Sequence, residues 1–159
     1  DKQTTAASEF EIIAPVSGEL VHLENTNDPA FSSRAVGDGV AVVPQEGTVC
    51  APVSGTVAAL FPTEHALGIM SDDSSAQVML HIGIDTVKLE GKGFHALVAQ
   101  GDHVDAGQPL VEVDFDAVRA AGFDPTVFVI VCERSENSTL REHASGPVAV
   151  KEPVVWLSE

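Results

Sequence analysis

The chain has 159 residues, which is enough for one domain with a substantial core and too few for two ordinary domains. Hydrophobic residues make up 44% of the chain and charged residues 20%, so the composition is globular and excludes disorder as the default. Acidic residues outnumber basic ones by 24 to 8, and the formal net charge of -16 argues against nucleic acid or an anionic membrane surface as a partner.

Short runs rich in Val, Ile and Leu, separated by Gly, Pro, Asn and Asp, predict strands at 11–14, 39–43, 56–61, 78–84 and 127–131. This spacing predicts an all-β fold, an antiparallel β-sandwich or partly closed barrel with little helix. One helix is predicted at 114–121, with Asp114 as its N-cap and Gly122 as its stop. We expect residues 1–9 to be a polar linker or lead segment and residues 10–159 to form a single β-sandwich domain. No apolar run is long enough for direct membrane insertion.

The sequence also contains an internal duplication. The segment Ala14-Pro-Val-Ser-Gly18 recurs as Ala51-Pro-Val-Ser-Gly55, 37 residues later. Proline restricts φ and glycine permits a turn, so each copy predicts a strand, a tight turn and a second strand.

The segment 61–85 predicts a hairpin that carries two histidines. The turn-forming cluster at 72–74 lies between two strand-like runs and predicts a three-residue loop centred on Asp73. Paired residues then have numbers that add to 146, which places His65 directly opposite His81. Alternation along the second strand puts Val78, Leu80 and Ile82 in the core and turns His81 outward.

The same register surrounds the two imidazoles with apolar side chains. It places Leu67 opposite Met79 on the outward face, with Phe61 nearby, and apolar groups around two polar rings suggest a site for docking another protein. Three interpretations of the pair remain open: two surface histidines with no role, a zinc or other metal site, and a nucleophile with an orienting partner. A metal site would need further ligands, and no adjacent cysteine or metalloprotease motif supplies them.

Several motifs together resemble the glucose-family enzyme IIA domain of the bacterial phosphoenolpyruvate-dependent sugar phosphotransferase system. They are Ile12-Ile-Ala-Pro-Val-Ser-Gly18, Val36-Gly-Asp-Gly39, Ala51-Pro-Val-Ser-Gly-Thr56, Thr63-Glu-His-Ala66 and, most specifically, the block His81-Ile-Gly-Ile-Asp-Thr-Val-Lys-Leu-Glu-Gly-Lys-Gly-Phe94. The similarity runs from about residue 10 to Leu157 and implies a phosphotransferase component with an antiparallel β-sandwich fold. Ile82 and Glu64 depart from the residues that are frequent in the family at these positions.

The resemblance also implies roles for individual residues. His81 would be phosphorylated at Nε2, His65 would stabilise and orient the phosphoryl group, and Thr63 would hold His65. Independently of the resemblance, the register of the hairpin assigns Phe61, Leu67 and Met79 to a partner-docking surface, and we assign Asp85 to the same surface. No cofactor is required, and a zinc ion at His65 and His81 is the open alternative.

The implied partners are the phosphorylated His carrier protein as donor and the cysteine of a sugar-specific IIB domain as acceptor. The expected location is the cytoplasm, with the domain either free or tethered to a membrane permease. A competing hypothesis is a non-catalytic module that binds regulatory target proteins, or is bridged to them by metal, through the His65 and His81 face. A lipoyl-like carrier would need a modifiable hairpin lysine, and none of the four lysines has that setting.

Overall fold

The computed structural model describes residues 9–73 and 75–158. Its strands are β1 (Glu9–Ile13), β2 (Gly18–His22), β3 (Asp38–Pro44), β4 (Thr48–Cys50), β5 (Gly55–Leu60), β6 (Ala66–Ser71), β7 (Ala76–Ile82), β8 (Phe94–Ala96), β9 (His103–Val104), β10 (Pro109–Val113), β11 (Val127–Arg134), β12 (Thr139–Glu142), β13 (Gly146–Val148) and β14 (Pro153–Ser158). Its helices are the short 3-10 helices η1 (Leu23–Asn25) and η2 (Thr86–Leu89) and the α-helices α2 (Pro29–Ser32) and α3 (Phe115–Ala120). The predicted all-β class with little helix is confirmed.

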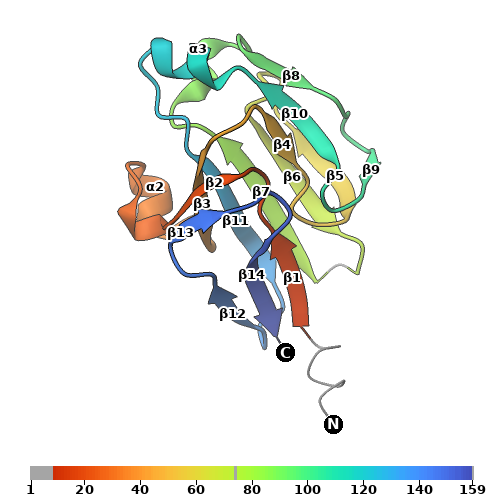
Figure 1. The fold of residues 1–159 in the computed structure, drawn as a ribbon. Coiled ribbons are helices and arrows are strands. Elements are labelled where there is room, and N and C mark those ends of the chain that lie inside the picture. Colours follow the sequence, from red (N-terminus) through yellow and green to blue (C-terminus); the bar gives the residue numbers. More distant parts are fainter. Residues whose placement is uncertain (1–8, 74, 159) are drawn as a thin grey trace.

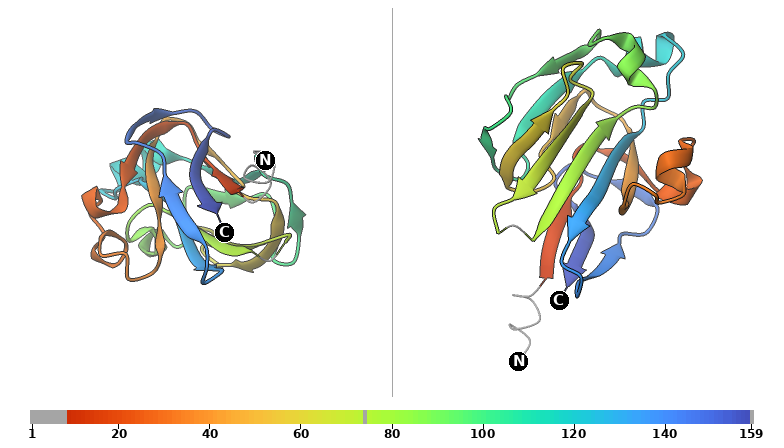
Figure 2. Two further views of the ribbon diagram at one scale, coloured as in Figure 1. Left: turned by 90° about the horizontal axis from the view of Figure 1, so that it is seen from below. Right: turned by 180° about the vertical axis from the view of Figure 1, so that it is seen from behind.

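The described strands form three sheets. The largest has eight strands in the order β13-β2-β3-β11-β7-β6-β5-β9, and the two others have the orders β4-β10-β8 and β1-β14-β12. Within each sheet, the described strands pair in antiparallel orientation. Figure 1 shows β4, β8 and β10 stacked over the strands β5 to β7, and Figure 2 shows the large sheet from behind. The arrangement is an open sandwich rather than a closed barrel.

Strands β3 and β11 bury side chains on both faces of the large sheet, whereas β7 buries one face and half-buries the other. One face contributes Val40, Val78 and Val129 to the main core between the sheets. The other face contributes Ala41, Phe128 and Ile130 to a second cluster, which Leu23 of η1 and Phe31 of α2 complete. Alternation along a strand requires this separation, because successive side chains point to opposite faces. His81 lies on the second face.

The two copies of the repeated motif each connect two strands, as predicted, and they also bond to each other. The Ile13 N–H donates to the Pro52 carbonyl at 3.0 Å, and the Cys50 N–H donates to the Pro15 carbonyl at 2.7 Å. These two bonds are equivalent, because the repeat offset of 37 positions relates Ile13 to Cys50 and Pro15 to Pro52. The duplication seen in the sequence is therefore a local two-fold relationship in the structure.

The predicted register of the His65–His81 hairpin is wrong by one residue. Ala66, and not His65, pairs with His81, and Leu67 pairs with Leu80. Strand β6 ends at Ser71 and β7 begins at Ala76, so the connection is four residues long rather than three. The Asp73 carboxylate accepts hydrogen bonds from the Ser71 hydroxyl and the Ser75 N–H, both at 2.9 Å, which determines the length of the turn.

The helix predicted at 114–121 is confirmed as α3, and the Asp114 side chain accepts from the Ala117 N–H at 3.0 Å, as an N-cap does. The prediction missed α2, which begins with Asp28 as N-cap and Pro29 in the first turn. Most of the predicted lead segment, residues 1–8, lies outside the described residues, whereas Glu9 is the first residue of β1. None of the described helices has the length and apolar character needed to cross a bilayer.

Candidate functional site

His81 lies near the end of β7, and a hydrogen bond determines its ring orientation. Its Nδ1 lies 2.8 Å from the Gly83 carbonyl oxygen. A carbonyl only accepts, so Nδ1 carries the proton and a neutral ring keeps its lone pair on Nε2. The sequence block that follows His81 therefore supplies the backbone acceptor that selects the tautomer.

The backbone after His81 is held in place on both sides. The Gly83 N–H donates to the Thr126 carbonyl at 2.8 Å, and the Thr86 hydroxyl donates to the Ile82 carbonyl at 2.5 Å. Gly83 has a φ of +81°, and a Cβ there would lie 2.4 Å from Thr86 Cγ2. Only glycine fits at this position, which explains why the Gly83 carbonyl can point back at the His81 ring.

His65 precedes β6 and reaches His81 from the neighbouring strand. The two ring centroids lie 5.1 Å apart with the planes at 86°. Thr63 Oγ1 lies 2.5 Å from His65 Nδ1, and its hydroxyl can donate to that nitrogen. The proton of a neutral His65 then resides on Nε2. The structure thus brings together Thr63, His65 and His81, although the two histidines are not cross-strand partners.

Burial keeps both rings neutral at physiological pH. The His65 side chain is 3% exposed, and burial, followed by the nearby His81, lowers its pKa to about 4. Burial also lowers the pKa of His81, while the Gly83 carbonyl and the carboxylates of Asp28 and Asp85 oppose that change. A neutral imidazole with a free Nε2 is a nucleophile, and a neutral imidazole with Nε2–H is a hydrogen-bond donor.

The four predicted docking residues have different surroundings. Phe61 is 45% exposed and lies edge-on to His65, with ring centroids 5.5 Å apart, and Asp85 is also exposed. Met79 is half-buried against the second cluster. Leu67 is fully buried in the main core, so its assignment to the docking surface is wrong. The cause is the one-residue error in register, because such a slip moves a side chain to the opposite face.

Two residues near His81 escaped the sequence analysis. Phe31 of α2 packs against the His81 ring at 5.2 Å between centroids and stacks on Phe128 at 4.4 Å. Asp28, the N-cap of α2, is one of the carboxylates that partly oppose the lowering of the His81 pKa by burial. The sequence signal was present, since an Asp followed directly by Pro is a typical helix start.

The two imidazoles can offer two ligands to a metal ion. Within residues 9–73 and 75–158, they belong to no group of three or more His, Cys, Asp or Glu side chains that could hold one. Zinc in proteins is bound by at least three protein ligands. The described residues therefore do not by themselves complete a zinc site.

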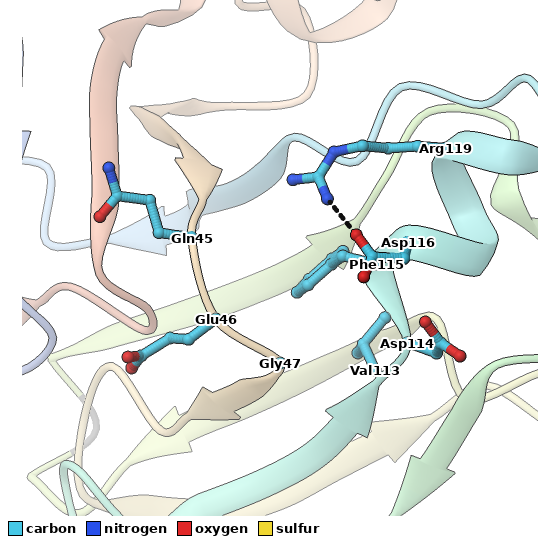
Figure 3. Close-up of a pocket in the computed structure, with 8 residues that line it drawn as sticks. All are labelled: Gln45, Glu46, Gly47, Val113, Asp114, Phe115, Asp116 and Arg119. Atoms are coloured by element: carbon cyan, nitrogen blue, oxygen red, sulfur yellow. Dashed lines mark hydrogen bonds and ion pairs between the residues drawn. The ribbon is translucent and has the colours of Figure 1, made fainter.

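A separate pocket lies between the β3–β4 connection and the start of α3, as Figure 3 shows. Two of its acidic side chains are already paired, because Asp116 bonds to Arg119 at 3.3 Å and Asp114 caps α3. It contains none of the predicted site residues. Its lining consists of Gln45, Glu46, Gly47, Val113, Asp114, Phe115, Asp116 and Arg119.

The chain is similar to known proteins over most of its length. The family model for the phosphoenolpyruvate-dependent sugar phosphotransferase system, EIIA 1, matches residues 10–137. The chain is 42% identical over 144 residues to the glucose-specific EIICBA component of Streptococcus pneumoniae, a match covering 91% of this chain and 20% of that protein. It is 43% identical over 149 residues to the beta-glucoside-specific EIIBCA component of Bacillus subtilis, covering 93% and 24%. The chain thus spans about a fifth to a quarter of these relatives.

A solved structure of similar length shares the fold. Glucose permease IIA from Mycoplasma capricolum superimposes with a TM-score of 0.85 at 34% identity, and the match covers 93% of this chain and 95% of that one. The sequence resemblance, the antiparallel sandwich and these matches agree. The chain belongs to the EIIA 1 family of the phosphoenolpyruvate-dependent sugar phosphotransferase system.

Proposed function

We propose that this chain carries a phosphoryl group on Nε2 of His81, accepting it from the phosphorylated His carrier protein and passing it to the cysteine of a sugar-specific IIB domain. The observation that carries this proposal is the hydrogen bond between His81 Nδ1 and the Gly83 carbonyl, because it leaves Nε2 as the nucleophile. The names of the relatives, which combine IIA with IIB and IIC, support a IIB partner.

The first step conserves protons and electron pairs. The Nε2 lone pair of His81 attacks the phosphorus of the donor phosphohistidine, and the donor P–N bond breaks with its electron pair returning to the donor nitrogen. His81 keeps its Nδ1 proton, so its ring becomes an imidazolium whose charge offsets part of the phosphoryl charge. In the second step a cysteine thiolate attacks phosphorus, and the electron pair of the broken P–N bond returns to Nε2. Such transfers depend on alignment and charge neutralisation.

His65 would act on the transferring group rather than form a bond to it. With Thr63 donating to Nδ1, the Nε2–H of His65 can donate to a phosphoryl oxygen on His81. Asp28 and Asp85 bring negative charge near His81, and the net charge of the chain is -16. We therefore expect the partners to supply the cations that neutralise the phosphoryl group across the interface. The relatives' IIC components would place this exchange on the cytoplasmic side of a membrane permease.

Labelling tests the proposal. The chain is incubated with phosphoenolpyruvate, the general phosphotransferase enzyme and the His carrier protein, and the labelled residue is mapped. We expect label on His81 alone, its loss in His81→Gln, and its retention in His103→Gln, a surface histidine paired with Asp72. Label retained by His81→Gln contradicts the proposal.

The alternative function, a non-catalytic module that binds regulatory or metal-bridged partners, uses the same face. The feature that favours it is exposed Phe61 beside two imidazoles. Zinc titration of the unlabelled chain distinguishes the two: a chain that binds zinc at His65 and His81 and accepts no phosphoryl group is the module.

A further inference from the structure

Glu64 has an unusual backbone conformation beside the proposed site. It lies in the loop between β5 and β6, where its N–H donates to the Phe61 carbonyl at 2.8 Å. Its φ is +64°, the left-handed region. Hairpin loops of this kind usually place glycine at such a position. A contact made by the glutamate side chain can explain why this position is not glycine.

The Glu64 side chain connects two sheets. Its Oε1 accepts from the Ala96 N–H at 2.5 Å. Ala96 belongs to β8, the edge strand of the sheet β4-β10-β8. The next residue, Leu97, donates its N–H to Leu110 at 2.8 Å, so the Ala96 N–H points to the open side of the edge strand. Glu64 therefore fastens the hairpin that carries His65 to the edge of the smaller sheet.

This contact acts on the backbone that carries Thr63 and His65. On one side, the His65 carbonyl accepts from the Ile82 N–H at 2.7 Å, which ties the loop to the strand of His81. On the other side, the described bond between Glu64 and Ala96 ties it to β8. Three consecutive side chains thus point to three neighbours: Thr63 to the His65 ring, Glu64 to β8, and His65 to His81.

We propose that Glu64 is a positioning residue for His65, acting through its bond to the Ala96 N–H. The inference rests on the proposed function, in which His65 assists transfer from His81. The role depends on a hydrogen-bond acceptor rather than on negative charge, since the partner is a neutral amide. Glutamine can fill it and alanine cannot.

The test compares Glu64→Ala and Glu64→Gln with the wild-type chain. For transfer from phosphorylated His81 to a purified sugar-specific IIB domain, we expect Glu64→Ala to lower kcat about tenfold with unchanged KM. Glu64→Gln should stay within about twofold of the wild type. The matched control is Glu90→Ala, which removes an exposed glutamate that also has a positive φ, +55°, and whose side chain makes no hydrogen bond among the described residues.

A second measurement is independent of phosphoryl transfer. Nitrogen-15 spectra of the unphosphorylated chain report the His65 tautomer, and amide exchange reports protection of the Ala96 N–H. We expect a single Nε2–H tautomer and a protected amide in the wild type and in Glu64→Gln. Both should be lost in Glu64→Ala, while Glu90→Ala should resemble the wild type.

The outcomes separate the two proposals. If the wild-type chain takes no label on His81, the proposed function fails, whatever the spectra of the variants show. If the wild type transfers normally and Glu64→Ala matches it in kcat and in spectra, the positioning role is overturned. If Glu64→Gln is as slow as Glu64→Ala, or Glu90→Ala is equally slow, the role of the acceptor is overturned as well.

Discussion

Gly107 and Lys151 occupy equivalent positions in the two halves of the internal duplication. The Gly107 N–H donates to the Ala51 carbonyl at 2.8 Å, and the Lys151 N–H donates to the Ala14 carbonyl at 2.9 Å. Both residues have left-handed backbones, with φ of +89° and +77°. Gly107 adopts this conformation without strain, whereas for Lys151 the same conformation costs free energy.

Replacing Lys151 with glycine should therefore stabilise the chain. Glycine adopts the left-handed conformation without strain, which raises the free energy of unfolding by about 1–2 kcal/mol. Glycine also gives the unfolded chain more conformational freedom, which lowers the free energy of unfolding and offsets part of that increase. We expect Lys151→Gly to raise the free energy of unfolding by about 0.5–1 kcal/mol, measured by urea denaturation. Lys151→Ala keeps the conformation and should show no gain, so equal stabilisation by both variants would contradict the explanation.

Removal of His65 should separate acceptance of the phosphoryl group from its delivery. His81 keeps its Gly83 partner and its free Nε2 in His65→Gln, so acceptance from the His carrier protein should continue. Delivery to the IIB domain should slow about 100-fold, because the flexible glutamine amide does not replace the imidazole Nε2–H that Thr63 holds toward the phosphoryl oxygens. Rapid-quench measurement of both steps checks this, and a variant with full delivery would refute the role of His65.

The Thr63 hydroxyl should affect delivery through the Nε2 proton of His65, because it determines the tautomer of that ring. In Thr63→Val the His65 Nδ1 loses its donor, and the ring can adopt the other tautomer. We expect delivery to slow about tenfold in Thr63→Val and to remain near the wild-type rate in Thr63→Ser. If both variants deliver at the wild-type rate, the hydroxyl does not control the tautomer.

Acid should destabilise the fold before the carboxylates titrate. His65 has a pKa near 6.5 in the unfolded chain and about 4 in the folded chain. Between these values the unfolded chain binds more protons, so protonation favours unfolding. The contribution of neutral His65 to stability is therefore complete above pH 6.5 and is lost as the pH falls toward 4. Between pH 6.5 and 5 we expect the free energy of unfolding to fall by about 1.5 kcal/mol from this group. The lowered pKa of His81 acts in the same direction.

Urea denaturation at several pH values measures this effect. The pH dependence should be shallower in His65→Gln, whatever the absolute stability of that variant. His103 contributes in the opposite sense, because Asp72 raises its pKa, and His103→Gln should make the decline slightly steeper. An identical slope for the wild type and His65→Gln would show that folding leaves the pKa of His65 unchanged.

Local patterns in the sequence were sufficient for about half of the described elements, and they missed β8, β9, β10, β12, β13 and β14. Strands predicted at 39–43 and 127–131 appear as β3 and β11, and the Asp114 cap begins α3 as expected. The repeated motif forms the same strand, turn and strand twice. Thr63, His65 and His81 came from the resemblance to the family, and the structure brings all three together.

The errors concern contacts for which the sequence gave no recognisable pattern. Leu67 was assigned to the surface because the turn appeared to have three residues, and the Asp73 bonds give it four. Phe31 and Glu64 gave no sign of their contacts with His81 and Ala96, which lie 32 or more residues away along the chain.

From the sequence by itself, hydrophobic periodicity and turn-forming residues determined much of the strand pattern, because they act over a few neighbours. The repeated motif determined the duplication, and the resemblance to the family determined the roles of the two histidines. The tertiary structure alone decided the register of the hairpin, the perpendicular approach of the two rings and the anchoring of their loop to a second sheet. The register follows from side-chain hydrogen bonds within the turn, which the turn composition alone did not specify. The approach of the rings and the anchoring of the loop depend on contacts between segments far apart in the chain, for which a single sequence holds no local signal.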